Sequence, residues 1–248
     1  MTGKLTKSQA KFIKSLQQKK YRDLNHRFVA EGIKLVQEAL QYPGVVDFVV
    51  YVGDDEQLPF SIEVDSYRVS EAELKSISSL KSPNKILAVC KYDEPFGKWL
   101  YDKPILALDE ISDPGNLGSI LRLADWFGID TVVCNPGSVD VYNPKVVQAT
   151  MGSIFRVKVY YRSIIEVIED MPSNMMVYGA DMDGENIYET SFKSPYMLVM
   201  GSESHGLSEG LQKHVHQMVA IPKFGNGESL NVAISTGIIL SEIKRKLL

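Results

Sequence analysis

Three short segments of the chain each place a glycine-rich turn directly after an apolar run. Segment 108–122 contains Asn116, Gly118 and Arg122, and segment 197–207 contains Gly201 followed closely by Glu203. A glycine at position 201 lets a ligand approach the backbone, and the Glu203 carboxylate could accept hydrogen bonds from ribose hydroxyls. Simpler readings stay open: Arg122 as an exposed side chain on a capped helix, and Glu203 as a charge facing the next helix N-terminus.

The third segment, 219–233, contains Ile221-Pro222, a Gly-Asn-Gly loop, and Ser229-Leu230-Asn231 ahead of a helical pattern. Ser229 or Asn231 is a natural N-cap, which needs no function. In open α/β sheets, however, ligands bind at the carboxyl ends of the strands. Three such turns in this order therefore predict one shared site.

Several other kinds of site are missing from the sequence. No G-x-G-x-x-G turn follows the first strand of the C-terminal part, and no G-x-x-x-x-G-K-[S/T] phosphate loop occurs. The four histidines are not at H-E-x-x-H spacing and no cysteine pair joins them, so we expect no metal. Cys90 and Cys134 lie in apolar runs, which predicts buried free thiols in a reducing compartment.

The elements that must position these segments follow from the hydrophobic pattern. Short, fully apolar runs at 105–108, 131–134, 176–180, 197–200 and 218–221 alternate with helical patterns, and 154–160 has the alternation of an edge strand. Runs of this kind are typical of a parallel sheet covered on both faces, so the fold class is α/β. We expect helices at 119–127 and 231–246.

A smaller α/β unit precedes this sheet. Residues 28–40 place Ile33, Val36 and Leu40 on one helical face, and strands are expected at 45–52 and 85–90. Ser70 and Glu73 have capping-box spacing for a helix through residue 80. Proline, glycine and charge mix at 93–104, so we predict domains at 1–95 and 104–248.

Charge is unevenly distributed over the 248 residues. The net charge is −4, yet residues 1–35 carry nine Lys or Arg against two acidic residues, a local charge of +7. This favours contact with a nucleic acid or anionic surface, although a solvated helix face or a frayed tail would have the same composition. No apolar run is long enough for a membrane span, and the start lacks the apolar core of a signal peptide. We expect a cytoplasmic protein without a membrane partner.

Together, the three motifs resemble those of the SpoU/TrmH-type RNA ribose 2′-O-methyltransferases of the SPOUT superfamily. The resemblance covers about 104–248 and rests on Asn116-x-Gly118-x-x-x-Arg122, Gly201-x-Glu203-x-x-Gly206, and Ile221-Pro222 with Ser229-Leu230-Asn231. More loosely, residues 20–95, with Arg27-Phe28-x-x-Glu31-Gly32, resemble an L30e-like substrate-binding domain.

The resemblance implies a mostly parallel sheet with a trefoil knot, S-adenosylmethionine as cofactor, and a site completed in a homodimer. It implies backbone contacts to the cofactor from Gly201, Ile221 and Leu230, with Ala180 and Met182 lining the adenosine pocket. It places Arg122, Asn116, Glu203, Ser229 and Asn231 at the reactive end.

The resemblance also implies an RNA substrate, with ribosomal RNA favoured over transfer RNA because an L30e-like domain suits structured RNA. It places Arg122 beside the 2′-hydroxyl. A guanidinium is permanently protonated, so we interpret Arg122 as a phosphate grip that stabilises the developing alkoxide rather than as the base. The alternatives are a non-catalytic RNA-binding paralogue and a nicotinamide-dependent enzyme.

Overall fold

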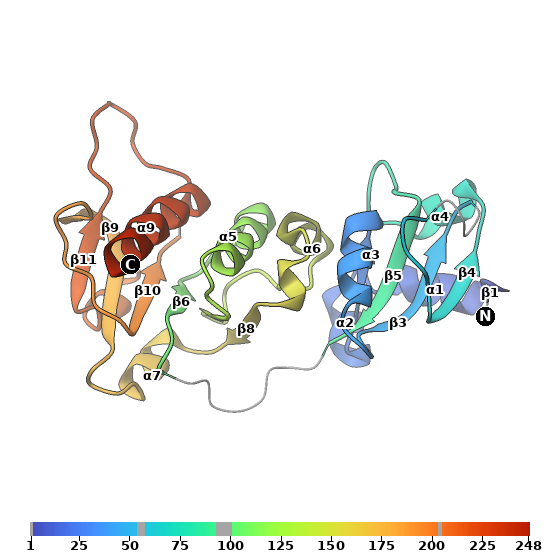
Figure 1. Ribbon diagram of the computed structural model, residues 1–248, viewed down its shortest axis with the longest axis horizontal. Coiled ribbons are helices and arrows are strands. Elements are labelled where there is room, and N and C mark those ends of the chain that lie inside the picture. The colour runs from blue at the N-terminus through green and yellow to red at the C-terminus, as the bar shows by residue number, and fades with distance from the viewer. Residues whose placement is uncertain (1, 54–57, 93–100, 203–204) are drawn as a thin grey trace. The chain divides into compact units, whose positions relative to one another are not determined.

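A computed structural model describes residues 2–53, 58–92, 101–202 and 205–248. The chain forms two compact units (Figure 1). Unit 1 comprises Met1–Glu94 and Asp140–Phe155, and unit 2 comprises Pro95–Val139 and Arg156–Leu248. Among the helices within these described ranges, none combines the length and apolar character needed to cross a membrane.

Unit 1 is built on a mixed five-stranded sheet. Its order is β1 (Thr2–Lys4), β4 (Asp65–Arg68), β3 (Val46–Tyr51), β5 (Ile86–Lys91) and β2 (Arg27–Glu31). The pairs β1–β4 and β3–β4 are parallel, and β5 pairs antiparallel with both β3 and β2. The strands predicted at 45–52 and 85–90 are confirmed within a residue or two.

The helix expected over 28–40 is wrong in its first part. Residues 27–31 form β2, with Phe28 and Ala30 buried, and helix α3 begins only at Ile33 (Ile33–Leu40). Gly32 separates the two elements with φ +105°, a conformation that interrupts a helix and that glycine adopts without strain. Partnering with β5 therefore overrides the local helical pattern of Phe28–Glu31.

The basic N-terminal segment is a folded part of unit 1. Helix α1 (Lys7–Ser15) starts at a capping box formed by Thr6 and Gln9, and helix α2 (Lys19–Asn25) follows. Ile13 and Leu16 are fully buried against residues of β3, β5 and α4 (Glu71–Ile77). The reading as a frayed tail is therefore wrong. The Ser70–Glu73 capping box of α4 is confirmed, although that helix ends at Ile77 rather than at residue 80.

Residues 140–155 contain α6 (Pro144–Thr150) and a 3-10 turn (Ser153–Phe155), and their contacts are with unit 1. The Arg22 side chain, 3% exposed, binds the Asp140 carboxylate and donates to the backbone oxygens of Leu16 and Gln17, both at 2.9 Å. The rings of Tyr92 and Tyr142 stack with centroids 3.9 Å apart. The predicted range 104–248 counts this segment with the second domain. The domain ranges themselves stay a prediction.

Unit 2 is a six-stranded sheet in which every strand pair is parallel. Its order is β11 (Gln217–Ala220), β9 (Met176–Asn186), β10 (Tyr196–Met200), β6 (Ile105–Leu108), β7 (Thr131–Cys134) and β8 (Lys158–Tyr161). Every residue of β6, β7 and β10 is buried, which explains their continuous apolar character. The predicted parallel sheet is confirmed. The edge strand expected at 154–160 is β8, but it begins only at Lys158, because Ser153–Phe155 form a 3-10 turn.

Helices cover this sheet in two groups. Helices α7 (Ile164–Glu169) and α8 (Glu209–Gln212) pack on the side chains of Ile105, Val177 and Val199. Helices α5 (Pro114–Trp126) and α9 (Val232–Leu247) lie against each other (Figure 1). A Cβ atom on Gly237 of α9 would lie 3.3 Å from Leu123 of α5, so the two helices approach closely.

Both cysteines are buried free thiols, as predicted. Burial raises the pKa of the Cys134 thiol to about 12 and also raises the pKa of Cys90. Neither thiol therefore supplies a thiolate nucleophile at neutral pH.

Candidate active site

The carboxyl ends of four neighbouring strands bring the three sequence segments to one edge of the sheet. In the order β11-β9-β10-β6 all neighbours are parallel, so their carboxyl ends share that edge. Asp109 follows β6, Gly201 follows β10 and Ile221 follows β11, while Ala180 lies within β9. This is the location at which open α/β sheets bind ligands.

Asp109 joins the first segment to the second. Its backbone N–H donates to the Met200 carbonyl oxygen at 2.9 Å, and its carboxylate accepts from the Ser208 backbone N–H at 2.8 Å. The same carboxylate, 3% exposed, accepts from the side-chain amide of Asn135 at the end of β7. Asp109 is not among the residues predicted for the site, although an acidic residue directly after a fully apolar strand is a signal in the sequence.

The loop after β10 requires glycine at its first position. The backbones of Ser202 and Gly206 exchange two hydrogen bonds of 3.0 Å, which folds the loop back on itself. A Cβ atom on Gly201 would lie 2.1 Å from the Gly206 carbonyl carbon, so no other residue fits. Glu203, a predicted member of the reactive end, lies outside the described residues.

A side-chain hydrogen bond joins the first segment to the third. The Asn231 Nδ2 group donates to Asn116 Oδ1 at 2.9 Å. The Asn231 Oδ1 atom accepts from the backbone N–H groups of Ala233 and Ile234, so Asn231 is also the N-cap of α9. The Asn231 side chain therefore caps α9 and also contacts another predicted site residue, so the two roles do not exclude each other.

Arg122 is exposed on α5 and points away from Asn116. The helix begins at Pro114, capped by Asp113, and not at residue 119 as expected. Asn116 therefore lies inside the helix, and six residues of helix turn the two side chains about 120° apart. Asn116 and Arg122, which the resemblance places together at the reactive end, therefore do not contact each other. Within the described part of the chain, the Arg122 guanidinium makes no hydrogen bond or ion pair.

Among the residues expected to hold the cofactor, Gly201 and Ile221 directly follow β10 and β11, Ala180 and Met182 lie within β9, and Leu230 precedes the N-cap of α9. Ala180 and Ile221 are half-buried, whereas Met182 is 71% exposed and Leu230 is 51% exposed. Within the described residues, the backbone N–H and C=O groups of Gly201, Ile221 and Leu230 have no hydrogen-bond partner. Unused backbone groups beside a turn that admits only glycine fit a ligand held by main-chain hydrogen bonds, as expected for S-adenosylmethionine.

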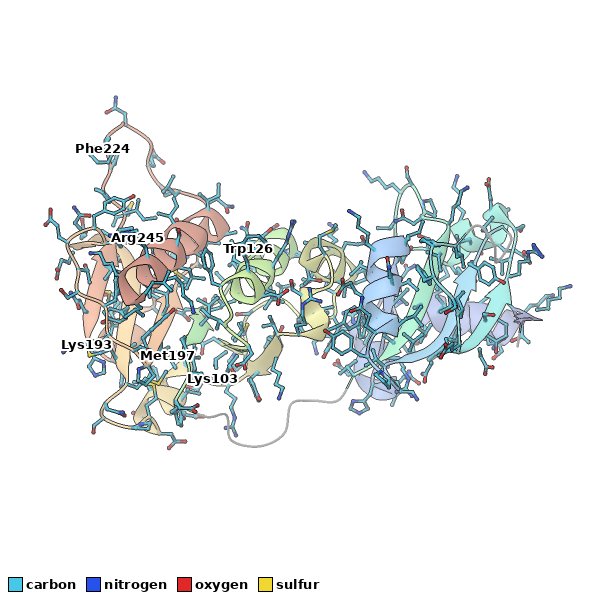
Figure 2. The ribbon with its side chains drawn as sticks, in the orientation of Figure 1. Lys103, Trp126, Lys193, Met197, Phe224 and Arg245 are labelled. Atoms are coloured by element: carbon cyan, nitrogen blue, oxygen red, sulfur yellow. The ribbon has the colours of Figure 1, made fainter. Side chains whose placement is uncertain are left out.

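A loop connects β11 to α9 and extends from this edge (Figure 1). Ser229 is exposed on it and makes no hydrogen bond to the other described site residues. Phe224, to which the sequence analysis assigned no role, lies in the outer part of this loop and is 94% exposed (Figure 2).

Solved structures share this architecture over the whole chain. A TrmH-family protein from Porphyromonas gingivalis superimposes with a TM-score of 0.87 at 35% identity, covering 98% of this chain and 100% of that one. The AdoMet-bound rRNA methyltransferase from Sinorhizobium meliloti superimposes with a TM-score of 0.85 at 31% identity, covering 100% of this chain and 98% of that one. Fold and site thus define an α/β methyltransferase domain of the SPOUT class preceded by a small α/β domain, as predicted.

Sequence comparison identifies the family within that class. The SpoU rRNA Methylase family matches residues 103–241, and the MRM3-like substrate binding domain matches residues 7–88. The 23S rRNA (guanosine(2553)-2′-O)-methyltransferase RlmP of Bacillus subtilis (strain 168) is 31% identical over 235 residues, which are 93% of this chain and 94% of that protein. The chain belongs to the SpoU family of S-adenosylmethionine-dependent RNA ribose 2′-O-methyltransferases.

Proposed function

We propose that this protein methylates a ribose 2′-hydroxyl of ribosomal RNA in the cytoplasm. The observation that carries the proposal is the meeting of the three motif segments at one sheet edge, joined by the Asn231–Asn116 and Asp109–Ser208 hydrogen bonds. The Bacillus subtilis relative is named for a guanosine of 23S rRNA, which supports ribosomal RNA as the substrate class.

S-adenosylmethionine supplies a methyl group that its sulfonium has already activated, so we propose that no metal takes part. The chain's role is to hold that group in line with the ribose oxygen. We assign the backbone groups of Gly201, Ile221 and Leu230 to cofactor binding, with Ala180 and Met182 beside the adenosine. The folded-back loop, closed by the hydrogen bonds between Ser202 and Gly206, leaves no room for a side chain at Gly201.

Arg122 acts on the RNA in this proposal. A ribose 2′-hydroxyl is a weak nucleophile at neutral pH, and a guanidinium, always protonated, cannot remove its proton. Arg122 instead binds the phosphate next to the target ribose and stabilises the negative charge that develops on the oxygen. The proton leaves to that phosphate or to water. Asn116 and Asn231 hold the surrounding loops through their hydrogen bond, and Ser229 and Glu203 complete the reactive end.

We further propose that the enzyme is a homodimer that pairs through α5 and α9. Three large apolar side chains on or beside these adjacent helices are exposed: Trp126 by 82%, Ile234 by 57% and Leu230 by 51% (Figure 2 labels Trp126). A second copy that covers them would bury this apolar surface. Leu230 would then join the cofactor site and the interface, because it directly precedes the Asn231 cap.

The decisive experiment incubates the purified protein with radiolabelled S-adenosylmethionine and RNA from cells that lack the gene. We expect label in ribosomal RNA, and a 2′-O-methyl site that is absent from total RNA of those cells. Label in transfer RNA alone would refute the substrate class. Cofactor binding without transfer to either RNA would identify a non-catalytic paralogue.

A further inference from the structure

An open pocket of about 360 Å³, called the cavity below, lies within unit 1, and none of its lining residues belongs to the three motif segments. It is lined by residues of the loop after α4 and of helix α6: Ser79, Leu80, Pro144, Lys145, Gln148 and Ala149. Its volume is in the range of small-ligand sites. Nothing in the proposed methyl transfer uses this cavity.

The walls of the cavity are held by a buried carboxylate. Glu31, 4% exposed, accepts hydrogen bonds from the Ser79 backbone N–H at 2.8 Å and from the hydroxyls of Ser78 and Ser79. The Glu31 carbonyl oxygen accepts from Gln148 Nε2 at 2.7 Å, so the same residue anchors both walls. The cavity is therefore preformed, which lowers the entropic cost of binding.

The lining combines apolar surface with a few polar groups. Leu80, Pro144 and Ala149 supply the apolar part of the lining. The Gln148 amide oxygen has no hydrogen-bond donor among the described residues, and the Lys145 side chain is exposed at the rim. Aliphatic walls with an amide and an ammonium group suit a planar heterocycle that has hydrogen-bonding edges.

The surroundings of the cavity are positively charged. The loop continues through Lys81 to Lys85, both exposed, and crosses close to Gly32: a Cβ there would lie 3.1 Å from Asn84 Nδ2. Lys34, in the first turn of α3, is also exposed. With Lys145, these three segments carry four lysines. Two acidic residues lie on the same elements. Glu31 is buried and already accepts hydrogen bonds, and Glu38 lies a turn beyond Lys34 on α3 with its side chain beside Gly152.

We infer that this cavity binds one unstacked nucleotide of the RNA substrate, with the base in the cavity and the adjacent phosphates on the rim lysines. The inference rests on the proposed function, because it takes the substrate to be RNA. Proteins that read single-stranded RNA take up unstacked bases, hydrogen-bond to the base edges and neutralise the flanking phosphates with Lys or Arg. The site positions the RNA and takes no part in methyl transfer.

Ala149→Leu in the full chain tests the base pocket, because the larger side chain fills the cavity without changing charge. We expect it to weaken binding of a single-stranded oligoribonucleotide of about 12 nucleotides at least fivefold, with S-adenosylmethionine affinity unchanged. The matched control is Ala72→Leu on the exposed part of α4, outside the cavity, which should bind as the parent does. A duplex of the same sequence should compete poorly.

Lys145→Ala tests the phosphate contact independently, with exposed Lys75 of α4 as the control position. The slope of log affinity against log salt concentration should become shallower by about 0.7, because one phosphate contact on a single strand is lost. If Ala149→Leu and Lys145→Ala both fold and keep the RNA affinity and the salt slope of the parent, the inference is overturned. Methyl transfer by the parent is measured in parallel, so loss of the proposed function is distinguished from loss of the cavity's role.

Discussion

Two arginines of unit 2 differ in their surroundings, and the difference supports the role proposed for Arg122. Arg156 pairs with the Asp125 carboxylate at 2.9 Å, whereas Arg122 makes no such contact within the described residues. An exposed cation without a protein partner is available to an anionic ligand. The loops that surround the predicted site are, by contrast, tied together through Asn116, Asn231 and Asp109.

Arg122→Ala should lower the rate of methyl transfer by about 100-fold or more, the loss typical of removing one group that stabilises developing charge. S-adenosylmethionine affinity, measured by calorimetry, should stay close to the parental value. Arg156→Ala serves as the control and should retain activity. An Arg122→Ala variant with near-parental turnover would remove this residue from the mechanism.

Asp109→Asn should act on cofactor binding rather than on the chemical step. The amide cannot accept from both the Ser208 N–H and the Asn135 side chain as the buried carboxylate does. We expect a loss of about 1–3 kcal/mol in stability and a raised KM for S-adenosylmethionine at little-changed kcat. Asp125→Asn, at a partly exposed ion pair, is the control. A fall in kcat alone would contradict a positioning role.

Helix α1 carries part of the positive charge in residues 1–35. Of the nine Lys and Arg residues in that segment, Arg22, Arg27 and Lys19 form ion pairs with Asp140, Asp47 and Asp23 inside unit 1. Lys7, Lys11 and Lys14 are exposed and, at this spacing, lie on one face of α1, opposite the buried Ile13. Two readings remain for this face, contact with RNA phosphates or simple solvation.

The triple substitution of Lys7, Lys11 and Lys14 by Gln separates these readings without removing Ile13 from the core. Contact of all three lysines with RNA predicts weaker binding and a salt slope lower by about 2 to 3, since each phosphate contact contributes about 0.7 to 0.9. Cofactor affinity should not change. Lys103→Gln, at an ion pair with Asp130, is the control. An unchanged slope would mean that the lysine face is only solvated.

At the scale of the whole molecule, the proposed homodimer makes the surface of α5 and α9 a binding surface. Trp126→Glu places a charge in that surface and should shift the protein from dimer to monomer in light scattering, with its circular dichroism retained. If the partner completes the site, the monomeric variant should also lose methyl transfer activity. The control is Leu24→Glu, because Leu24 is also an exposed apolar side chain, 71% exposed, but lies on α2 of unit 1. A Trp126→Glu variant that stays dimeric would place the interface elsewhere.

The sequence determined the features that depend on neighbouring residues. The apolar runs at 105–108 and 131–134 predicted β6 and β7 at those bounds, and the Ser70–Glu73 spacing predicted the start of α4. Hydrophobic period and capping chemistry are local, so they can be read along the chain.

Only the tertiary structure decided the features that depend on distant partners. Pairing with β5 makes residues 27–31 a strand, and contacts with unit 1 hold residues 140–155. The early start of α5 turns Arg122 away from Asn116, whose hydrogen-bond partner is Asn231, 115 residues along the chain. The physical reason is that hydrogen bonding and burial between distant segments outweigh weak local preferences, and no local pattern records which segments will meet.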